Sequence, residues 1–338
     1  MSAPVHTVSV VIPAYNAVEF LAEALDSVLG QTLPPLEVIV VDDGSEDETP
    51  RVAAAYSGKV TYIRKEHGGG CGGNRNVGIR AASGNWIALL DADDTWKPDL
   101  LAKLMERADE TGADLVFCDW LPQKTGRVIG PGNLESMGVR NRLDKLAQDN
   151  VLLNPFELLL EAGCYFSPSS VMIKRDALLQ IGLFDEGIYH TDDLDLWLRL
   201  SLKYRFAIVD EGLALRRIHG NNMSRDTWTL MINEIKTYEK LERYARPLAS
   251  GSRWRELLRK RKVPMLREEG AEYLKRGEPR LARKSWAKAF RESCNPRLAA
   301  YWLATFLPMS LAGTLRNCKE QSLFFFGHKY KNPPRASE

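Results

Sequence analysis

Cysteine is scarce in this sequence and follows no recognisable pattern. The 338 residues include five cysteines, and no two of them have the C-x-x-C spacing of a metal or redox site. An odd and scattered set also argues against a disulfide framework. We therefore expect a cytoplasmic chain with reduced thiols. The cysteines are Cys71, Cys118, Cys164, Cys294 and Cys318.

Neither a targeting segment nor a clear membrane span is expected from the patterns in this sequence. A strand-like run begins at Val8, and no charged region with an apolar signal-peptide core precedes it. The longest uncharged stretch, residues 298–315, is marginally shorter than the roughly 20 apolar residues that a spanning helix needs. Pro308 also interrupts it. We expect an interfacial helix or a core helix pair in this stretch.

Charge is distributed unevenly, although the net charge is only +2. Residues 236–338 contain 24 Lys and Arg against 10 Asp and Glu, whereas the first 235 residues contain 22 and 34. An acidic body with a basic tail indicates two functions in two places. Nucleic acid is not expected as a partner, because the body is acidic and no recognition module is visible.

The basic region carries an amphipathic helical pattern around residues 281–290. Most helices of this kind pack on their own domain. The alternative is peripheral contact with an anionic membrane, here the inner face of the cell membrane.

Short β-branched runs alternate with helical patterns over the first 120 residues. This alternation predicts a mostly parallel sheet with helices on both faces. Residues 122–150, rich in Gly, Pro and charge, are expected to form a loop or flexible segment, and residues from about 228 onward are expected to be helical. The expected strands are 8–12, 38–41, 60–64, 86–90 and 114–118, and the expected helices 19–29, 49–56, 74–82 and 97–111.

Polar segments follow three of the expected strands: Pro13-Ala14-Tyr15-Asn16, Asp42-Asp43-Gly44-Ser45 and Asp91-Ala92-Asp93-Asp94. Ligands of such sheets collect at the carboxyl ends of the strands, so these segments should converge. Clustered carboxylates repel one another unless a cation or hydrogen-bond donors compensate, and Mg²⁺ binds through one or two carboxylates plus substrate phosphates. The Asp91–Asp94 cluster therefore suits a metal–diphosphate site, although Asp94 would also serve as a helix N-cap.

Asp192 and Asp193 stand at the start of a further expected helix, which has Leu194, Trp197 and Leu198 on one face. The helix dipole favours carboxylates there, which is a sufficient structural explanation. An Asp can also act as a general base when an alcohol lies within reach. The local pattern leaves both possibilities open.

Taken in order, these motifs resemble the family 2 glycosyltransferases. The matching segments are residues 8–16, 40–49, 76–94 and 182–200, within a resemblance that covers about residues 5–225. The resemblance implies the GT-A fold, in which a Rossmann-like, mostly parallel sheet is flanked by helices. It also implies a glycosyltransferase domain at 1–227, with a nucleotide-sugar half at about 5–120 and an acceptor half at 121–227. Residues 228–338 lie outside this domain and are expected to form a basic helical region.

The activity implied by the resemblance is inverting transfer from a nucleoside-diphosphate sugar, UDP-linked in the first instance, to a hydroxyl of a saccharide or lipid-linked saccharide. Cell-surface polysaccharide or glycolipid synthesis would be the setting. Asp193 would be the base, with Asp192 in support. Asp93, with His219 as a second ligand, would hold Mn²⁺ or Mg²⁺. The implied donor-binding residues are Pro13, Tyr15, Asn16, Asp43, Arg75, Asp91 and Asp93.

Two other functions compete with this one. Residues 68–73 match G-x-G-x-x-G after a strand and before a helix, which is the pattern of an NAD(P)-dependent enzyme. The preceding strand ends in the charged Arg64-Lys65-Glu66-His67, however, and that function leaves the other acidic motifs unused. We therefore expect the glycines to form a mobile loop over the donor. The third class, a non-catalytic sugar-nucleotide binder, has no feature in its favour.

Overall fold

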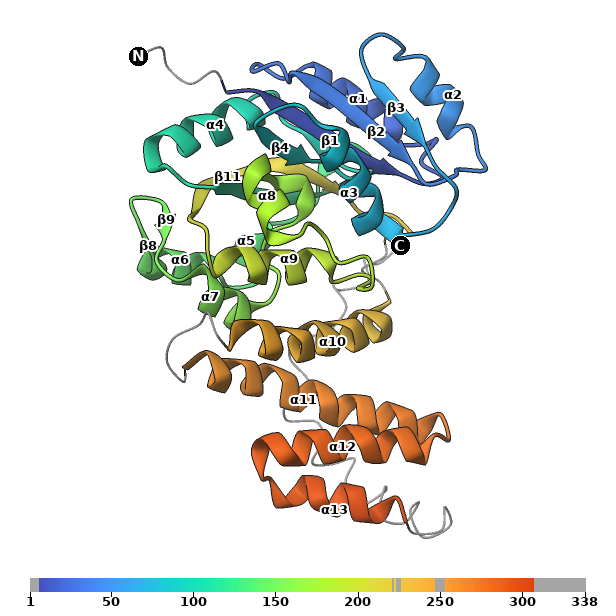
Figure 1. Cartoon of the computed structure of the whole chain (residues 1–338), viewed down its shortest axis with the longest axis vertical. Helices are drawn as coiled ribbons and strands as arrows, with labels where there is room; N and C mark the ends of the chain where they lie inside the picture. Colours follow the sequence, from blue (N-terminus) through green and yellow to red (C-terminus); the bar gives the residue numbers. More distant parts are fainter. Residues whose placement is uncertain (1–5, 221, 223–225, 247–252, 307–338) are drawn as a thin grey trace. The chain divides into compact units, whose positions relative to one another are not determined.

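The computed structural model describes residues 6–220, 222, 226–246 and 253–306 of the chain. It forms two compact units, divided between Leu258 and Arg259. The first unit is a sheet covered by helices, and the described part of the second is helical (Figure 1).

The strands are β1 (Val8–Ala14), β2 (Glu37–Asp42), β3 (Thr61–Arg64), β4 (Trp86–Leu89), β5 (Thr95–Trp96), β6 (Leu115–Lys124), β7 (Arg127–Val128), β8 (Ala147–Gln148), β9 (Val151–Leu152), β10 (Val171–Lys174) and β11 (Phe206–Arg217). The helices of the first unit are α1 (Leu21–Leu29), α2 (Thr49–Ala54), α3 (Gly70–Ala81), α4 (Leu100–Thr111), α5 (Asn133–Ser136), α6 (Arg140–Leu146), α7 (Pro155–Ala162), the 3-10 turn η1 (Pro168–Ser170), α8 (Arg175–Ile181), α9 (Asp192–Ser201) and α10 (Thr227–Ala245).

The strands of the described residues form one mixed sheet in the order β3-β2-β1-β4-β10-β6-β11-β9-β8, with β5 beside β11 and β7 beside β6. The first four strands pair in parallel, as the alternation of strands and helices predicts. β10 lies antiparallel between β4 and β6. The expected α/β class with flanking helices is therefore confirmed, and all five expected strands are present.

Side-chain alternation along β1 explains why both faces of the sheet are covered. Val8, Val10 and Ile12 belong to the buried cluster that also contains the apolar face of α1. Val11 points to the opposite face, against α3. A Cβ at Gly78 would lie 2.4 Å from Val11 Cγ1, so only glycine lets this helix approach the strand so closely.

The segment 122–150 is not the open loop that its composition suggested. It contains the end of β6, then β7, α5, α6 and β8. The buried carboxylate of Asp119 anchors it by accepting hydrogen bonds from the amides of Trp120 (2.8 Å) and Leu134 (3.1 Å). Arg140 adds an ion pair to Asp210 (2.7 Å). Long-range polar contacts, which composition does not reveal, order this segment.

The division between the units lies well beyond the boundary expected at 227, because α10 packs on α9 within the first unit. The hydroxyls of Thr191 and Thr237 are 2.9 Å apart. Lys240 on α10 also pairs with Asp195 (2.8 Å) and Asp185 (2.6 Å). These contacts make α10 part of the sheet-containing unit.

The described part of the second unit consists of α11 from Arg259 onward (Arg253–Lys275 in full), α12 (Pro279–Ser293) and α13 (Pro296–Ala304). The Trp286 indole donates a hydrogen bond to the Arg267 carbonyl (2.9 Å), where Gly270 leaves room for the ring. No helix in the described part of the chain is long and apolar enough to cross a membrane. Residues 307–315 of the uncharged stretch lie outside the described residues.

Candidate active site

The polar segments after β1, β2 and β4 lie at one edge of the sheet, because these strands are parallel and adjacent. Ala14 pairs with Asp42, and Val11 pairs with Leu89. The Asp43 amide donates a hydrogen bond to the Ala14 carbonyl (2.9 Å), which joins the first two segments directly.

The first group at this edge surrounds the Asp43 carboxylate, which is 3% exposed. It accepts hydrogen bonds from the Lys65 ammonium and, at 3.2 Å, from the Gly68 amide. Nδ1 of His67 lies 3.2 Å from it, and the His67 ring stacks on the exposed ring of Tyr15 with centroids 4.4 Å apart. Lys65 and His67 are not among the predicted site residues, because in the sequence their charge argues only against a buried strand.

Pro13 in β1 and Asn16, two residues after the end of β1, support this group. Asn16 has a positive φ of 47°, and its amide donates to the Ser45 hydroxyl (2.9 Å). Its side-chain oxygen accepts from the Glu46 amide (2.9 Å). Pro13 is buried within β1 opposite Val41. These two residues fix the path of the chain beneath Tyr15.

Arg75 joins the second and third acidic motifs. Its Nη2 donates to Asp91 Oδ1 (2.6 Å) and its Nη1 to Asp192 Oδ2 (3.0 Å), while its side chain is only 5% exposed. Burial alone would lower the pKa of Arg75, but the charges of Asp91 and Asp192 outweigh it and raise the pKa. A buried cation is tolerated here because it is paired on both sides.

Asp192 and Asp193 begin α9, as predicted, but their surroundings differ. Burial raises the pKa of Asp192, and Arg75 opposes that rise. Asp193 accepts hydrogen bonds from the Leu194 amide (2.7 Å) and the Cys164 thiol (3.4 Å). Burial, followed by the charge of Asp192, raises the pKa of Asp193 to about 6. A carboxylate with a pKa in this range suits proton transfer near neutral pH.

The three carboxylates of the Asp91–Asp94 cluster have different partners. Asp91 pairs with Arg75, and Asp93 pairs with Nε2 of His219 at 2.9 Å. Asp94 is not a helix cap: the residue before α4 is Asp99, and β5 intervenes. Asp94 instead accepts from the Ser169 hydroxyl (2.6 Å) and the Arg217 amide (3.0 Å). Burial, then the charges of Asp93 and Asp91, raise its pKa to about 8.

The pair Asp93–His219 is the part of the site that could hold a metal ion. Asp93 and His219 are partly exposed, 32% and 21%, and no three His, Cys, Asp or Glu side chains of the described residues converge on one point. Mn²⁺ or Mg²⁺ commonly takes one or two protein ligands and completes its shell with substrate phosphates and water. The pair fits such an ion if a diphosphate supplies the remaining oxygens.

Comparison with known proteins identifies the chain. The model of glycosyl transferase family 2 matches residues 9–166. An uncharacterized glycosyltransferase of Rickettsia prowazekii (strain Madrid E) is 32% identical over 241 residues, which cover 69% of this chain and 70% of that protein. The chain belongs to glycosyl transferase family 2. It is therefore an enzyme of the glycosyltransferase class, as the order of its motifs predicted.

Two further matches extend the comparison. The succinoglycan biosynthesis protein ExoO of Rhizobium meliloti is 46% identical over 109 residues, 32% of this chain and 31% of that one. The crystal structure of Staphylococcus aureus TarS 1–349 in complex with UDP-GlcNAc has a TM-score of 0.61 at 16% identity, covering 88% of this chain and 84% of that one. This likeness shows the fold, and the expected GT-A class of the family 2 glycosyltransferases is confirmed.

Membership of glycosyl transferase family 2 leaves no support for an NAD(P)-dependent enzyme. Gly70 to Gly73 form the first turn of α3 and are not a loop. A Cβ at Gly72 would lie 2.9 Å from Asp192 Oδ2, so this glycine lets the helix pack directly against the acidic pair. Gly72 is thus explained by a contact within the glycosyltransferase site.

Ser169 is a third residue of the glycosyltransferase site that is not among the predicted ones. Its hydroxyl donates to Asp94 and accepts from the Asp91 amide (3.1 Å), so it joins both ends of the acidic cluster. The Trp96 indole donates to the Ser169 carbonyl (2.6 Å) and fixes this turn. Only the polar run at 167–170, directly before an apolar strand, signals it in the sequence.

The polar segment that contains the predicted ligand His219, residues 216–224, contributes Arg217, His219 and Asn222 to the same site. Arg217 Nε donates to the Asp93 carbonyl (3.2 Å), and the Asn222 amide donates to Asp93 Oδ2 (3.4 Å). The His219 ring lies 4.9 Å from that of Phe20. Residues 221 and 223–224 of the motif lie outside the described residues.

Proposed function

We propose that this family 2 glycosyltransferase transfers a sugar from a UDP-sugar to a hydroxyl group with inversion, and that Asp193 is the general base. The observation that supports the proposal is that Asp192 and Asp193, although adjacent, have different partners. Asp192 is bound to Arg75, whereas Asp193 forms no ion pair with any described residue. Asp193 is therefore the carboxylate that can accept a proton without first breaking an ion pair.

The proposed reaction is a single displacement. The acceptor oxygen attacks the anomeric carbon as the bond from that carbon to the diphosphate oxygen breaks, and the acceptor proton passes to Asp193. One displacement inverts the configuration at the anomeric carbon, unlike the double displacement of retaining two-carboxylate enzymes. A positioned general base contributes about 10²–10⁴-fold to such a step.

The donor would lie along the carboxyl edge of the sheet. Tyr15 and Asp43 would meet the nucleobase, with Pro13 and Asn16 shaping that end, and Asp91 would meet the ribose or the sugar. Arg75 would hold Asp91 at the donor and Asp192 beside the base. A UDP-linked donor is supported by the nucleotide sugar bound to TarS, which has the same fold.

The diphosphate would lie near Asp93 and His219, and these two residues would hold Mn²⁺ or Mg²⁺. Such an ion, when bound, neutralises the charge of the departing diphosphate. The side chains of Asp93 and His219 already touch at 2.9 Å, so an ion and phosphate oxygens would separate them only slightly.

The acceptor is proposed to be a growing cell-surface polysaccharide or a glycolipid. The likeness to ExoO, a succinoglycan biosynthesis protein, supports this acceptor class. A lipid-linked acceptor would bring the enzyme to the inner face of the cell membrane, and the basic C-terminal region supports peripheral contact there.

The test is a panel of UDP-, GDP- and dTDP-linked sugars, read by nucleotide release with Mn²⁺, with Mg²⁺ and with a chelator. We expect metal-dependent release from a UDP-sugar. Release from only GDP- or dTDP-sugars would contradict the choice of nucleotide, and equal release in the chelator would contradict the metal. Product anomers determined by NMR would contradict inversion if the donor configuration were retained.

A further inference from the structure

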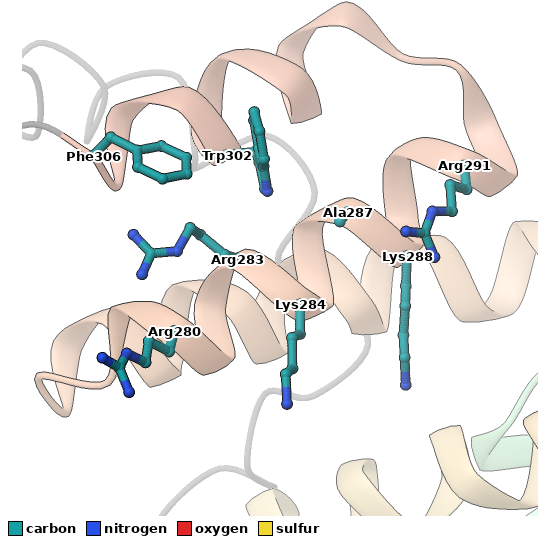
Figure 2. Close-up of a pocket in the computed structure, with 8 residues that line it drawn as sticks. All are labelled: Arg280, Arg283, Lys284, Ala287, Lys288, Arg291, Trp302 and Phe306. Carbon is teal, nitrogen blue, oxygen red and sulfur yellow. The ribbon is translucent and has the colours of Figure 1, made fainter.

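The second unit contains an open groove between α12 and the end of the α13 segment. The groove has a volume of about 500 Å³. Its floor is the α12 surface at Ala287, and Trp302 and Phe306 point from the α13 side toward α12 (Figure 2). Five cations from α12 and no acidic residue line it: Arg280, Arg283, Lys284, Lys288 and Arg291.

Four of these cations form a row along one exposed side of α12. Arg280, Lys284, Lys288 and Arg291 are three or four residues apart, so they succeed one another along the same face for about 16 Å. Lys284 and Lys288 extend side by side in the same direction (Figure 2). Arg280, Lys284 and Arg291 form no ion pair with any residue that the structure describes. Like charges held this close favour an anionic ligand.

The fifth cation, Arg283, is used to build the groove. Its guanidinium lies over the Phe306 ring, 4.6 Å from the centroid, and donates to the Thr305 carbonyl (3.3 Å). Trp302 meets Phe306 edge to face with centroids 5.1 Å apart. Arg283 therefore holds the aromatic side of the groove beside the row of cations.

The rim of the groove is unusually apolar for a surface in water. Leu303 is 59% exposed and Phe306 is 60% exposed, next to Trp302 at 36%. Phe290 lines a second hollow with Trp302 and Leu303. A soluble polyanion would satisfy the cations but would leave these side chains in water. A lipid surface satisfies both, because phosphates meet Lys and Arg while Trp, Leu and Phe enter the headgroup region.

We propose that the groove between α12 and α13 binds the phosphate groups of anionic phospholipids while Trp302, Leu303 and Phe306 enter the bilayer interface. The inference rests on the membrane contact in the proposed function and assigns it to a defined surface. The row on α12 would lie parallel to the membrane plane, so that several headgroups are contacted at once.

The groove is built on a rigid base within its own unit. Lys262, almost fully buried on α11, pairs with Glu292 of α12 at 2.5 Å. The Trp286 ring lies 5.5 Å from that of Tyr301, which joins α12 to α13. Neither contact involves Arg280 or Lys284, so charge reversal at these two residues should leave the helices folded.

The experiment is flotation of the full-length protein with vesicles of phosphatidylcholine alone or with about 30% phosphatidylglycerol, which gives the surface a negative potential. We expect binding to the anionic vesicles, little binding to the neutral ones, and loss of binding as salt is raised. Arg280→Glu with Lys284→Glu should reduce partitioning onto anionic vesicles at least about tenfold. Trp302→Ala with Phe306→Ala should reduce it by a similar factor.

The matched control is Arg259→Glu with Arg297→Glu. This pair makes the same change in net charge at two exposed residues of the same unit that do not line the groove. We expect at most about a threefold effect from it, because salt screens charges distant from the binding face. An equal loss in the control and in the row variant would overturn the proposal, since binding would then depend on net charge alone.

Polyphosphate separates the lipid from a soluble polyanion. The proposal predicts that the aromatic variant loses vesicle binding but keeps any binding to polyphosphate. Strong polyphosphate binding with vesicle binding unaffected by the aromatic changes would instead identify a polyanion site and overturn it. Donor turnover is measured on every preparation in solution: turnover with no flotation contradicts the groove alone, and flotation with no turnover contradicts the proposed function alone.

Discussion

Most carboxylates at the carboxyl edge of the sheet are held by named partners in buried or half-buried surroundings, whereas the groove on α12 is lined by mostly exposed cations and by no acidic residue. Arg75 holds Asp91 and Asp192 at hydrogen-bonding distance, and Ser169 with Arg217 holds Asp94. Arg280 and Lys284 extend into solvent. Burial makes an unpaired charge costly, so the buried charges need hydrogen-bonding or ionic partners, and these partners fix their positions.

The two regions use charge for different purposes. Fixed, desolvated charge can act on one atom of a substrate, which is what bond breaking requires. Exposed charge contributes little one residue at a time, but a row of it attracts a charged surface. Single substitutions should therefore have large effects in the first unit, and only multiple ones should have effects in the second.

The largest single effect is expected for Asp193→Asn. The amide keeps the shape and can still accept from the Leu194 amide, but it cannot take a proton from the acceptor. Turnover should fall about 10²–10⁴-fold with little change in donor KM. Steady-state kinetics on the best donor measure this.

Asp176→Asn is the matched control for that variant, because Asp176 also lies in the first turn of a helix, α8, but is exposed. It should behave as wild type. An Asp193→Asn enzyme with undiminished turnover would contradict the assignment of the base. It would also contradict the expectation that single substitutions have large effects in the first unit.

Arg75→Met tests the buried network through stability. Removing the guanidinium leaves two largely buried carboxylates facing each other without a cation, which should cost about 3–5 kcal/mol of unfolding free energy. Urea denaturation measures this loss of unfolding free energy.

Arg80→Met on the same helix is the control, since Arg80 and Glu186 are both more than half exposed and lie 3.9 Å apart. Its cost should be within about 1 kcal/mol of zero, and similar losses in the two variants would show that burial does not govern the effect.

Gly72→Ala and Gly73→Ala form a matched pair in the first turn of α3. A Cβ at Gly72 would lie 2.9 Å from Asp192 Oδ2 and 3.2 Å from Phe184 Cβ, so the acidic pair must shift, at about 1–3 kcal/mol. A Cβ at Gly73 meets only the Glu186 side chain, at 3.7 Å, and should gain up to about 1 kcal/mol from helix propensity. Turnover should drop only in Gly72→Ala. The same response of both variants would mean that the glycines serve the helix and not the site.

The sequence predicts the parallel part of the sheet and the strand-end motifs well, because β-branched runs such as 38–41 have one plausible structure. Sequence patterns do not predict the structure of segments whose conformation depends on contacts with distant parts of the chain. Gly70–Gly73 are poor helix formers, yet close packing against Asp192 and Phe184 makes them the start of α3. β11 was not expected, because its twelve residues contain Asp210, Glu211 and Gly212 and are paired along β6 across a bulge.

The same limit applies to the site. The sequence predicts which carboxylates gather, but not the groups that compensate them. Arg75, which the resemblance predicts at the donor, bridges two of the predicted acids, and nothing in the local sequence indicates that bridge. Asp94 resembles a cap locally, and only the fold brings Ser169 to it from a distant segment. Partners of buried charge come from other elements, so local patterns cannot reveal them.

The raised pKa of Asp193 should determine how both the activity and the stability of the enzyme depend on pH. With a pKa of about 6, Asp193 is ionised at neutral pH and becomes protonated below it. The value of kcat/KM should therefore be level above about pH 7 and fall about tenfold per pH unit below 6.

Because the folded-state pKa of Asp193 lies above the ordinary 3.8 of the unfolded chain, the folded protein binds the proton more tightly. Asp193 thus lowers stability as pH rises from about 4 through 6, by about 3 kcal/mol in the limit. Asp193→Asn should then be inactive yet more stable than wild type at pH 7.5, with the difference vanishing near pH 4. Urea titrations at both pH values measure it. Equal stability at both would mean that Asp193 is not desolvated, and the contrast between its buried charge and the exposed row on α12 would not hold for the base.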